Sequence, residues 1–293
     1  NYSVTVTDTI GCTVTDSADK KCRQAIRQTL RRSPGAFIVI AGCYAQLRQE
    51  EIKSIPGVDL VLGTNEKYKL ADYLDNLEKR SAPQIYNCGK DEDTVFNAAF
   101  SGSERTRAFL KIQDGCDYLC SYCAIPHARG RSRNQPVKDC LRDAEEIAGR
   151  GIKEIVLTGV NIGDFGKTSG ESLTDLLKEL LKVTGIARYR ISSIEPDLLS
   201  DEIIDMVADQ ERLMPHFHIP LQSGSDKILA SMRRCYKRNV FESRVRRIRE
   251  TIPLAGIGAD VITGFPCETD SEFEETYKFL DSMDLSYLHV FSF

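Results

Sequence analysis

The sequence predicts an α/β protein made of a small parallel α/β domain at residues 1–88 and a partial (β/α)6 barrel at residues 105–293. From Phe109 onward, apolar strand patterns alternate six times with helical patterns, which indicates a parallel sheet. Six repeats over roughly 185 residues are too few for an eight-stranded barrel of about 250 residues. A shorter alternation of the same kind occupies about the first 80 residues.

The composition restricts the class of protein. With 41% hydrophobic and 28% charged residues over 293 positions, the chain suits one large folded domain and one smaller one. We expect a cytoplasmic protein without a membrane partner, because no apolar stretch of about 18 residues and no signal-peptide pattern occurs. In the reducing cytoplasm, ten cysteines indicate metal or redox chemistry rather than disulfides. A net charge of −4 limits RNA contacts to local basic patches.

The N-terminal domain combines short strands with an amphipathic helix. Cys12 and Cys43 each follow a predicted strand, where open parallel sheets place their ligand crevice. A polar stretch at residues 89–104 is expected to link the two domains. The strands are expected at residues 2–6, 37–41 and 58–62, and the helix at 17–30.

The barrel domain follows the same periodicities. The strands are expected at 109–113, 154–157, 188–192, 216–219, 258–262 and 287–291, and the helices at 137–148, 173–183, 201–208, 241–251 and 271–283. Barrel sites lie at the carboxyl ends of the strands. Small or polar residues follow five of these ends, at 115, 158–161, 192–195, 222–225 and 263–266. Turn chemistry explains any one of them, but five around one rim favour a site.

The stretch FLKIQDGCDYLCSYCAIPHARGRSR, residues 109–133, holds Cys116, Cys120 and Cys123 as CxxxCxxC at the end of the first barrel strand. Closely spaced thiolates suit zinc or iron. Structural zinc takes four protein ligands, usually as two CxxC pairs, and no second pair follows. On a [4Fe-4S] cube, three thiolates leave one iron open for a substrate or cofactor. The alternative is three reduced cysteines in a loop.

The CxxxCxxC spacing, with Tyr122 directly before Cys123, resembles the radical S-adenosylmethionine superfamily. The resemblance implies that the open iron binds S-adenosylmethionine and that an electron from the cube yields a 5′-deoxyadenosyl radical. The segments IAGCYAQ, QDGCDYLCSYC, LTGVNIGDFG, RISSIEP, FHIPLQSGSDKILASMRR and HVFSF together resemble the methylthiotransferases. That family combines an N-terminal α/β domain holding a second [4Fe-4S] cluster, a radical barrel and an RNA-binding β-barrel. This last β-barrel has no counterpart in the sequence.

Within this family, IPHARGRSR and CTVTDSADKKCRQ look most like one branch. That branch methylthiolates C2 of N6-threonylcarbamoyladenosine next to the tRNA anticodon. Its sister branches act on isopentenyladenosine in tRNA or on an aspartate of a ribosomal protein, and they tend to carry an acidic residue where this chain has Arg131. A different class of function, an iron-sulfur RNA-binding or redox-sensing module, is disfavoured because sensing needs no rim of glycines and polar residues.

The resemblance also implies site residues. Cys116, Cys120 and Cys123 would hold the radical cluster. The residues that would face S-adenosylmethionine are Tyr122, Gly159, Asn161, Glu195, Gln222, Ser223, Arg233, Gly264 and Phe265. Gly159 and Asn161 would approach its methionine end, and Gly264 and Phe265 its adenine. The alternative to a cofactor contact for Arg233 is a place in a solvated basic face.

His216 and His218 lie two residues apart and so share one face of a strand, which admits a metal pair. A hydrogen-bonded barrel interior is the favoured interpretation of these two histidines.

The auxiliary cluster is where the sequence departs from the family. Cys43 lies in IAGCYAQ, and Cys12 matches both of the other two cysteine segments at once, so a third ligand is missing. The resemblance implies two [4Fe-4S] clusters, of which these residues alone would hold the auxiliary one weakly. It also implies tRNA, a sulfur donor and a flavodoxin-like or ferredoxin-like electron donor as partners.

Two basic regions are candidates for RNA binding. Arg129, Arg131 and Arg133 alternate with small residues after the cysteine motif, and eight Lys or Arg fall in residues 233–249 against one Glu. Phosphate contacts by such residues make binding salt-dependent. For residues 233–249, a solvated helix face is the alternative.

Overall fold

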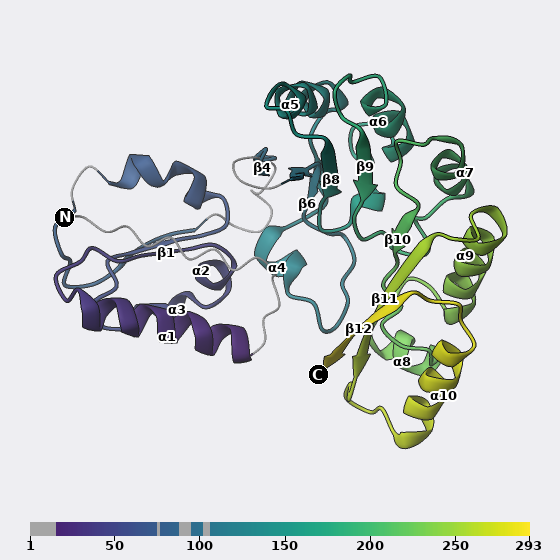
Figure 1. The fold of residues 1–293 in the computed structure, drawn as a ribbon. Coiled ribbons are helices and arrows are strands. Elements are labelled where there is room, and N and C mark those ends of the chain that lie inside the picture. The colour runs from purple at the N-terminus through teal and green to yellow at the C-terminus, as the bar shows by residue number, and fades with distance from the viewer. Residues whose placement is uncertain (1–15, 75–76, 88–94, 102–105) are drawn as a thin grey trace. The chain divides into compact units, whose positions relative to one another are not determined.

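A computed structural model describes residues 16–74, 77–87, 95–101 and 106–293, although side chains are described only from residue 20 onward. The chain forms two compact units (Figure 1). The N-terminal unit comprises residues 1–97 and 123–131, and the barrel unit comprises 98–122 and 132–293. The predicted strand at residues 2–6 and Cys12 lie outside the described residues, as does much of the predicted linker at 89–104.

The N-terminal unit contains one parallel sheet in the order β1-β2-β3. The predicted helix at 17–30 and the strands at 37–41 and 58–62 are confirmed as α1, β1 and β2. The elements are α1 (Asp16–Arg32), β1 (Val39–Ala41), α2 (Cys43–Leu47), α3 (Gln49–Lys53), β2 (Leu60–Leu62), η1 (Glu66–Tyr73), β3 (Gln84–Tyr86) and α4 (Ile125–Arg129).

A small apolar core holds this unit together. Ile26 of α1 packs with Ile52 and Val61 in one buried cluster, because α1 carries apolar residues on one side only. Asp59 is fully buried, and its carboxylate accepts from the backbone N–H of Ile38 at 2.7 Å and from Lys79 Nζ at 2.7 Å. These bonds satisfy the buried charge and fix the start of the sheet.

The barrel unit is an arc of six parallel strands. Strands β5, β8 and β9 pair in one sheet, which antiparallel β4 extends, and β10, β11 and β12 pair in another. Parallel bridges from Tyr189 to Leu213 and from Ser193 to His218 connect the two halves. The strands are β4 (Phe100–Ser101), β5 (Ala108–Lys111), β8 (Glu154–Thr158), β9 (Arg188–Ile191), β10 (His216–His218), β11 (Gly256–Thr263) and β12 (Tyr287–Ser292).

Helices cover one face of this arc (Figure 1). They are α5 (Val137–Gly149), α6 (Leu173–Leu180), α7 (Asp201–Asp209), α8 (Asp226–Ser231), α9 (Arg238–Thr251) and α10 (Asp270–Asp281), with a short η2 (Ile162–Asp164). Ser172 and Ser200 cap α6 and α7 by accepting from backbone N–H groups, and Thr269 and Glu272 form a capping box on α10. The large core cluster lies between these helices and the strands.

The predicted partial (β/α)6 barrel is confirmed, with all six strands and five helices in place. One detail differs, because the first predicted strand at 109–113 is divided. Its end forms β6 (Gln113–Asp114), which pairs antiparallel with β7 (Arg133–Asn134). No helix among the described residues is long and apolar enough to cross a bilayer.

Candidate active site

The first part of the cysteine motif is a loop that follows β6 and is held at several points. The Tyr118 hydroxyl donates to Asp197 at 2.6 Å, and Ser121 donates through its backbone N–H to the Met232 carbonyl at 3.0 Å. Burial, followed by the bond to Asp197, raises the pKa of Tyr118 well above its ordinary value, so its hydroxyl stays a donor. The loop carrying Cys116 and Cys120 is therefore fixed to the barrel by side chains far away in sequence.

Cys116, Cys120 and Cys123 are reduced and form no disulfide. Cys116 and Cys120 belong to the barrel unit, and Cys123 is the first residue of the segment grouped with the N-terminal unit. Along the chain, Cys123 follows Cys120 by three residues, which is the CxxxCxxC spacing of the predicted cluster motif. The spacing and the reduced state of the three cysteines fit a [4Fe-4S] group.

Gln113, which was not among the predicted site residues, ties this loop to the end of β8. Its fully buried side chain donates to the Gly115 carbonyl at 2.8 Å and to Ser132 Oγ at 2.9 Å. Its Oε1 accepts from the backbone N–H groups of Val160 and Asn161, both at 2.8 Å. One amide thus saturates its hydrogen bonds while joining three segments of the rim.

The same amide explains Gly159. A Cβ atom at that position would lie 2.8 Å from Gln113 Oε1 and 2.7 Å from Ile162 Cγ2, which is too close for any side chain. Glycine is therefore required by local packing, independently of any cofactor contact. The predicted contact of Gly159 with the methionine end of S-adenosylmethionine stays a prediction.

Asn161 lies at the rim with an unused acceptor. Its Nδ2 donates to Asp164 at 3.1 Å, while its Oδ1 is buried and accepts no hydrogen bond from the described residues. Burial raises the pKa of Asp164, and Lys167 at 3.6 Å opposes that rise. A buried amide oxygen without a donor is costly, and it fits a ligand that brings its own N–H group.

Arg234 is the centre of the densest network in the site. Its guanidinium donates to Cys120 Sγ at 3.3 Å and to the Tyr122 hydroxyl at 3.1 Å, and it forms an ion pair with Glu195. Its side chain is only 3% exposed. Tyr236 completes the network by donating to the Leu221 carbonyl at 3.1 Å while accepting from Arg234 at 2.9 Å. Three predicted site residues are thus brought together by an arginine that was not predicted.

This network has a consistent electrostatic role. The guanidinium beside Cys120 offsets the negative charge that a thiolate or an iron-sulfur cluster places there. Burial raises the pKa of Glu195 to about 7, and the charge of Arg234 opposes that rise. Burial likewise disfavours the charge of Arg234, but Glu195 holds the pKa of the guanidinium above its usual range. The pair therefore keeps a positive group against the sulfur.

Arg233, the predicted site residue, is exposed and has a left-handed backbone with φ of 57°. Its neighbour Arg234 makes the contacts with Cys120 and Glu195. A contact of Arg233 with the cofactor stays a prediction. The sequence Met232-Arg233-Arg234 alone does not distinguish the two arginines.

The other predicted cofactor residues lie at the ends of β10 and β11. Gln222 is 8% exposed with φ of 69°, a conformation that non-glycine residues adopt mostly under strain at functional sites. Ser223 is fully buried and bonds to Thr276 of α10 at 3.1 Å, which gives it a packing role. Phe265 packs with Ile262 in a buried cluster that Tyr122 also contacts. Gly264 has φ of 76°, which favours glycine.

The histidines of β10 occupy a polar barrel interior. His216 Nε2 lies 2.8 Å from Arg190 and 2.9 Å from the Tyr287 hydroxyl. Burial, followed by the charge of Arg190, lowers the pKa of His216 to about 4, so its ring is neutral at pH 7. His216 therefore has hydrogen-bonding partners, as expected of a barrel interior.

A second cluster in the barrel was not anticipated. His218 Nε2 lies 3.1 Å from Asp260 Oδ1, and His289 Nδ1 lies 3.2 Å from the same oxygen. The three groups are spaced closely enough to hold a cation. The contacts of both histidines with Asp260 also account for this arrangement without a cation.

The predicted RNA-binding arginines differ in exposure. Arg131 is exposed, whereas Arg133 is 8% exposed and lies 3.7 Å from Asp114. Arg129 is half-buried near the end of α4. Burial leaves Arg131 as the best placed of the three for a phosphate, and RNA binding by any of them stays a prediction.

The second predicted basic region is largely neutralised by acidic residues. Arg234 is buried against Glu195, and the arginines of α9 form ion pairs with residues of α7, α9, α10 and the loop before β12. The alternative stated for residues 233–249, a solvated helix face, is therefore the better description of α9. A guanidinium that already pairs with a carboxylate gains little binding free energy from a phosphate.

In the N-terminal unit, Cys43 is buried and begins α2 directly after β1, as predicted. It is disulfide-bonded in this structure. Because the thiolate is the ligating form of cysteine, Cys43 would have to be reduced before it could bind iron. The auxiliary cluster on Cys12 and Cys43 stays a prediction.

Comparisons with known proteins agree with this geometry. The Radical SAM superfamily model matches residues 110–280, and the model of the uncharacterized protein family UPF0004 matches residues 3–63. Threonylcarbamoyladenosine tRNA methylthiotransferase MtaB of Aquifex aeolicus is 40% identical over 284 residues, which cover 96% of this chain and 69% of that protein. The chain belongs to the radical SAM methylthiotransferase family.

Other relatives define its place in this family. The MtaB protein of Bacillus subtilis is 41% identical over 96% of this chain, and the chain spans 63% of its length. A tRNA-2-methylthio-N(6)-dimethylallyladenosine synthase of Syntrophus aciditrophicus is 33% identical over 96% of this chain and 63% of its own. The family resemblance predicted from the cysteine motif is therefore confirmed.

Solved structures support the fold. The cobalamin-dependent S-adenosylmethionine radical enzyme OxsB superposes with a TM-score of 0.57 at 13% identity, covering 90% of this chain and 42% of that one. The radical S-adenosylmethionine methyltransferase TsrM of Kitasatospora setae gives 0.54 at 18% identity, with 63% and 36% covered. At such identities the likeness concerns the fold alone.

Proposed function

We propose that this protein adds a methylthio group to C2 of N6-threonylcarbamoyladenosine beside the anticodon of tRNA. The observation that carries the proposal is the gradient of identity among relatives. Five threonylcarbamoyladenosine enzymes are 35 to 41% identical to this chain, whereas three dimethylallyladenosine synthases are 32 to 35% identical. Methylthiolation of isopentenyladenosine, or of a ribosomal-protein aspartate, is the runner-up.

The site residues suit the cofactors that this reaction requires. Cys116, Cys120 and Cys123 would hold a [4Fe-4S] cluster, and the rim of the barrel would hold S-adenosylmethionine. Together these groups, when bound, supply the reactive radical that removes the C2 hydrogen atom. The reduced cysteines of the motif, and the buried Oδ1 of Asn161 that accepts no hydrogen bond from the described residues, support this assignment.

The protein's own residues orient and charge-balance these groups. Arg234 holds Cys120 and Tyr122 in place and supplies positive charge at the sulfur. Asn161 offers an amide acceptor for the amino group of the cofactor, while Gln113 fixes the backbone on which Asn161 stands. Apolar Phe265 and Tyr122 offer a surface for an adenine ring. Residues that act only through these contacts are positioning residues.

The reaction also requires partners. We infer a flavodoxin-like or ferredoxin-like electron donor, a sulfur donor, and an auxiliary cluster involving Cys12 and Cys43 that would hold the transferred sulfur. Reduced cysteines in the motif and a tRNA substrate both suit the cytoplasm.

Mass spectrometry of tRNA nucleosides from cells lacking the gene tests the proposal. Methylthiolated threonylcarbamoyladenosine should disappear and return with the wild-type gene, but not with Cys120→Ala. Cys235→Ala, which removes an exposed thiol outside the motif, should restore it fully. Loss of the dimethylallyladenosine product instead would assign the sister branch. Unchanged nucleosides would refute a role in tRNA modification.

A further inference from the structure

Helix α1 lies in a long stretch of the sequence whose charged residues are all basic. Residues 20–49 contain seven Lys or Arg and no Asp or Glu, although the whole chain has a net charge of −4. Six of these cations are on α1, namely Lys20, Lys21, Arg23, Arg27, Arg31 and Arg32. Nothing in the proposed chemistry at the barrel site uses this helix.

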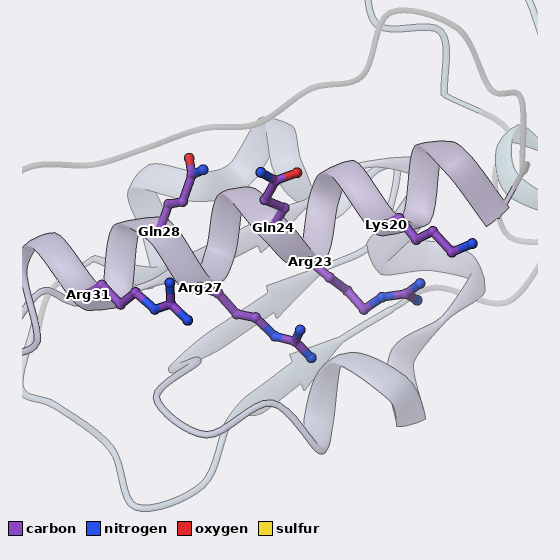
Figure 2. A pocket seen from close by; sticks show the side chains of 6 residues that line it. All are labelled: Lys20, Arg23, Gln24, Arg27, Gln28 and Arg31. Carbon is purple, nitrogen blue, oxygen red and sulfur yellow. The ribbon is translucent and has the colours of Figure 1, made fainter.

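The cations of α1 form an ordered surface. Cys22 and Ile26 turn into the core, which leaves the opposite side of the helix to polar residues. Figure 2 shows the side chains of Arg23, Arg27 and Arg31 leaving the helix in a row. Successive members stand four residues apart, which is about 6 Å along the helix axis.

Two shallow hollows flank this row. One, of about 280 Å³, is lined by Lys20, Arg23, Gln24, Arg27, Gln28 and Arg31 (Figure 2). The other, of about 410 Å³, lies between the same three arginines and the segment that follows α3. Its one acidic residue, Glu51, already forms an ion pair with Arg23. Arg27 and Arg31 thus face both hollows, and neither has an acidic partner in the part of the chain that the structure describes.

We propose that this face of α1, made of Lys20, Arg23, Gln24, Arg27, Gln28 and Arg31, binds the phosphate backbone of the RNA substrate. The inference rests on the proposed function for the identity of that RNA. Guanidinium groups bind phosphate oxygens through paired N–H donors. Their regular spacing suits an anion that repeats along a strand, and the two glutamines add donors for phosphate or ribose oxygens.

The chemistry of the face favours RNA over an acidic protein. Protein interfaces usually contain a buried aromatic or aliphatic anchor at their centre. The first hollow is lined only by basic and amide side chains. The second also has Leu30, Ile55 and Pro56 in its lining, but no aromatic residue. The all-polar lining of the first hollow is the pattern expected for sequence-independent contact with phosphates.

Salt-dependent binding tests the proposal. The holoprotein carrying Arg27→Gln and Arg31→Gln would be titrated with its tRNA between about 50 and 200 mM salt. Binding should weaken roughly tenfold at the lower salt concentration, and the slope of log K against log salt should decrease by about two units. The variant with Arg27→Lys and Arg31→Lys should retain most of the affinity and most of the salt slope.

Helix α9 provides a matched control. Arg246→Gln with Arg247→Gln removes the same charge from another surface helix, where both arginines already have acidic partners. This variant should keep affinity and slope within about twofold of the wild type. An equal loss in both double variants would reduce the effect to net charge and would overturn the assignment.

Two further readouts separate this inference from the proposed function. S-adenosylmethionine cleavage without RNA and thermal stability should be unchanged in the α1 variant. If the wild type modifies tRNA and the α1 variant binds it equally well, the inference is wrong and the function stands. If the wild type binds no tRNA, both fail. Loss of binding to an acidic sulfur-donor protein, with the tRNA salt slope intact, would assign the face to that protein.

Discussion

Helices α1 and α9 are both rich in arginine, but their charges meet very different surroundings. Every arginine of α9 has an acidic partner, through the pairs Arg238–Glu275, Arg244–Asp201, Arg246–Glu242, Arg247–Asp205 and Arg249–Asp284. On α1, Arg27 and Arg31 have none among the described residues. Both helices look alike in a count of charges, so only the tertiary neighbours distinguish a neutralised surface from one that can attract an anion.

Arg234, which precedes α9, is less exposed than any arginine of that helix and is paired with Glu195. Its substitution should therefore have the largest effect on stability. Arg234→Gln would leave Glu195 without its counter-charge in a buried site, which typically costs about 3–5 kcal/mol. Denaturant unfolding of the apoprotein would measure this loss. Arg233→Gln, at the exposed neighbouring position, should change stability by less than about 0.5 kcal/mol. Equal effects would show that Arg234 is not the residue that holds the network.

Within α9 itself, Arg249 should matter most to stability. Its guanidinium donates to the carbonyls of Asp284 at 2.7 Å and Ala255 at 2.6 Å, and its side chain is 17% exposed. Arg249→Ala leaves these carbonyls without their donor, so we expect a loss of about 2–3 kcal/mol. On α1, Arg27→Ala should be nearly neutral. A comparable loss at Arg27 would reveal a structural contact and would weaken the contrast between the helices.

The fold was largely predictable because it depends on local periodicity. The barrel strands and helices follow from short apolar runs and from 3.6-residue apolar patterns. β8, whose three middle residues are all buried, shows the first, and α6 shows the second. The ribbon of β6 and β7 was missed because its strands are two residues long and partly polar, as Gln113 and Arg133 show. Such pairing is determined by tertiary context rather than by pattern.

The site was predictable where spacing carries the chemistry and not where partners are distant. The cysteine motif is visible in the sequence because its ligands lie within eight residues. Arg234 meets Cys120 across 114 positions and Glu195 across 39, and no local signal announces either contact. Gln113 likewise reaches Asn161 across 48 positions. A polar residue at the end of a buried strand, next to the first cysteine, was the one available hint.

The smallest effect should have opposite signs in the two helices. In α1, Arg27 repels Arg23 and Arg31, which lie four residues away on either side. Arg27→Glu would turn both repulsions into attractions. Each repulsion and each attraction amounts to about 0.2–0.5 kcal/mol, so the variant should be more stable than the wild type by roughly 1 kcal/mol. In α9, Arg247→Glu would instead place a carboxylate against Asp205, and stability should decrease by a similar amount.

Thermal unfolding of the two Glu variants in parallel measures this difference. A stability gain at Arg27, together with weaker tRNA binding, would mean that α1 keeps a repulsive row of arginines that the isolated fold does not need. Such a trade between stability and function is common at binding surfaces. Loss of stability in both helices would mean instead that Arg27 is held by an acidic group, and the distinction between α1 and α9 would fail.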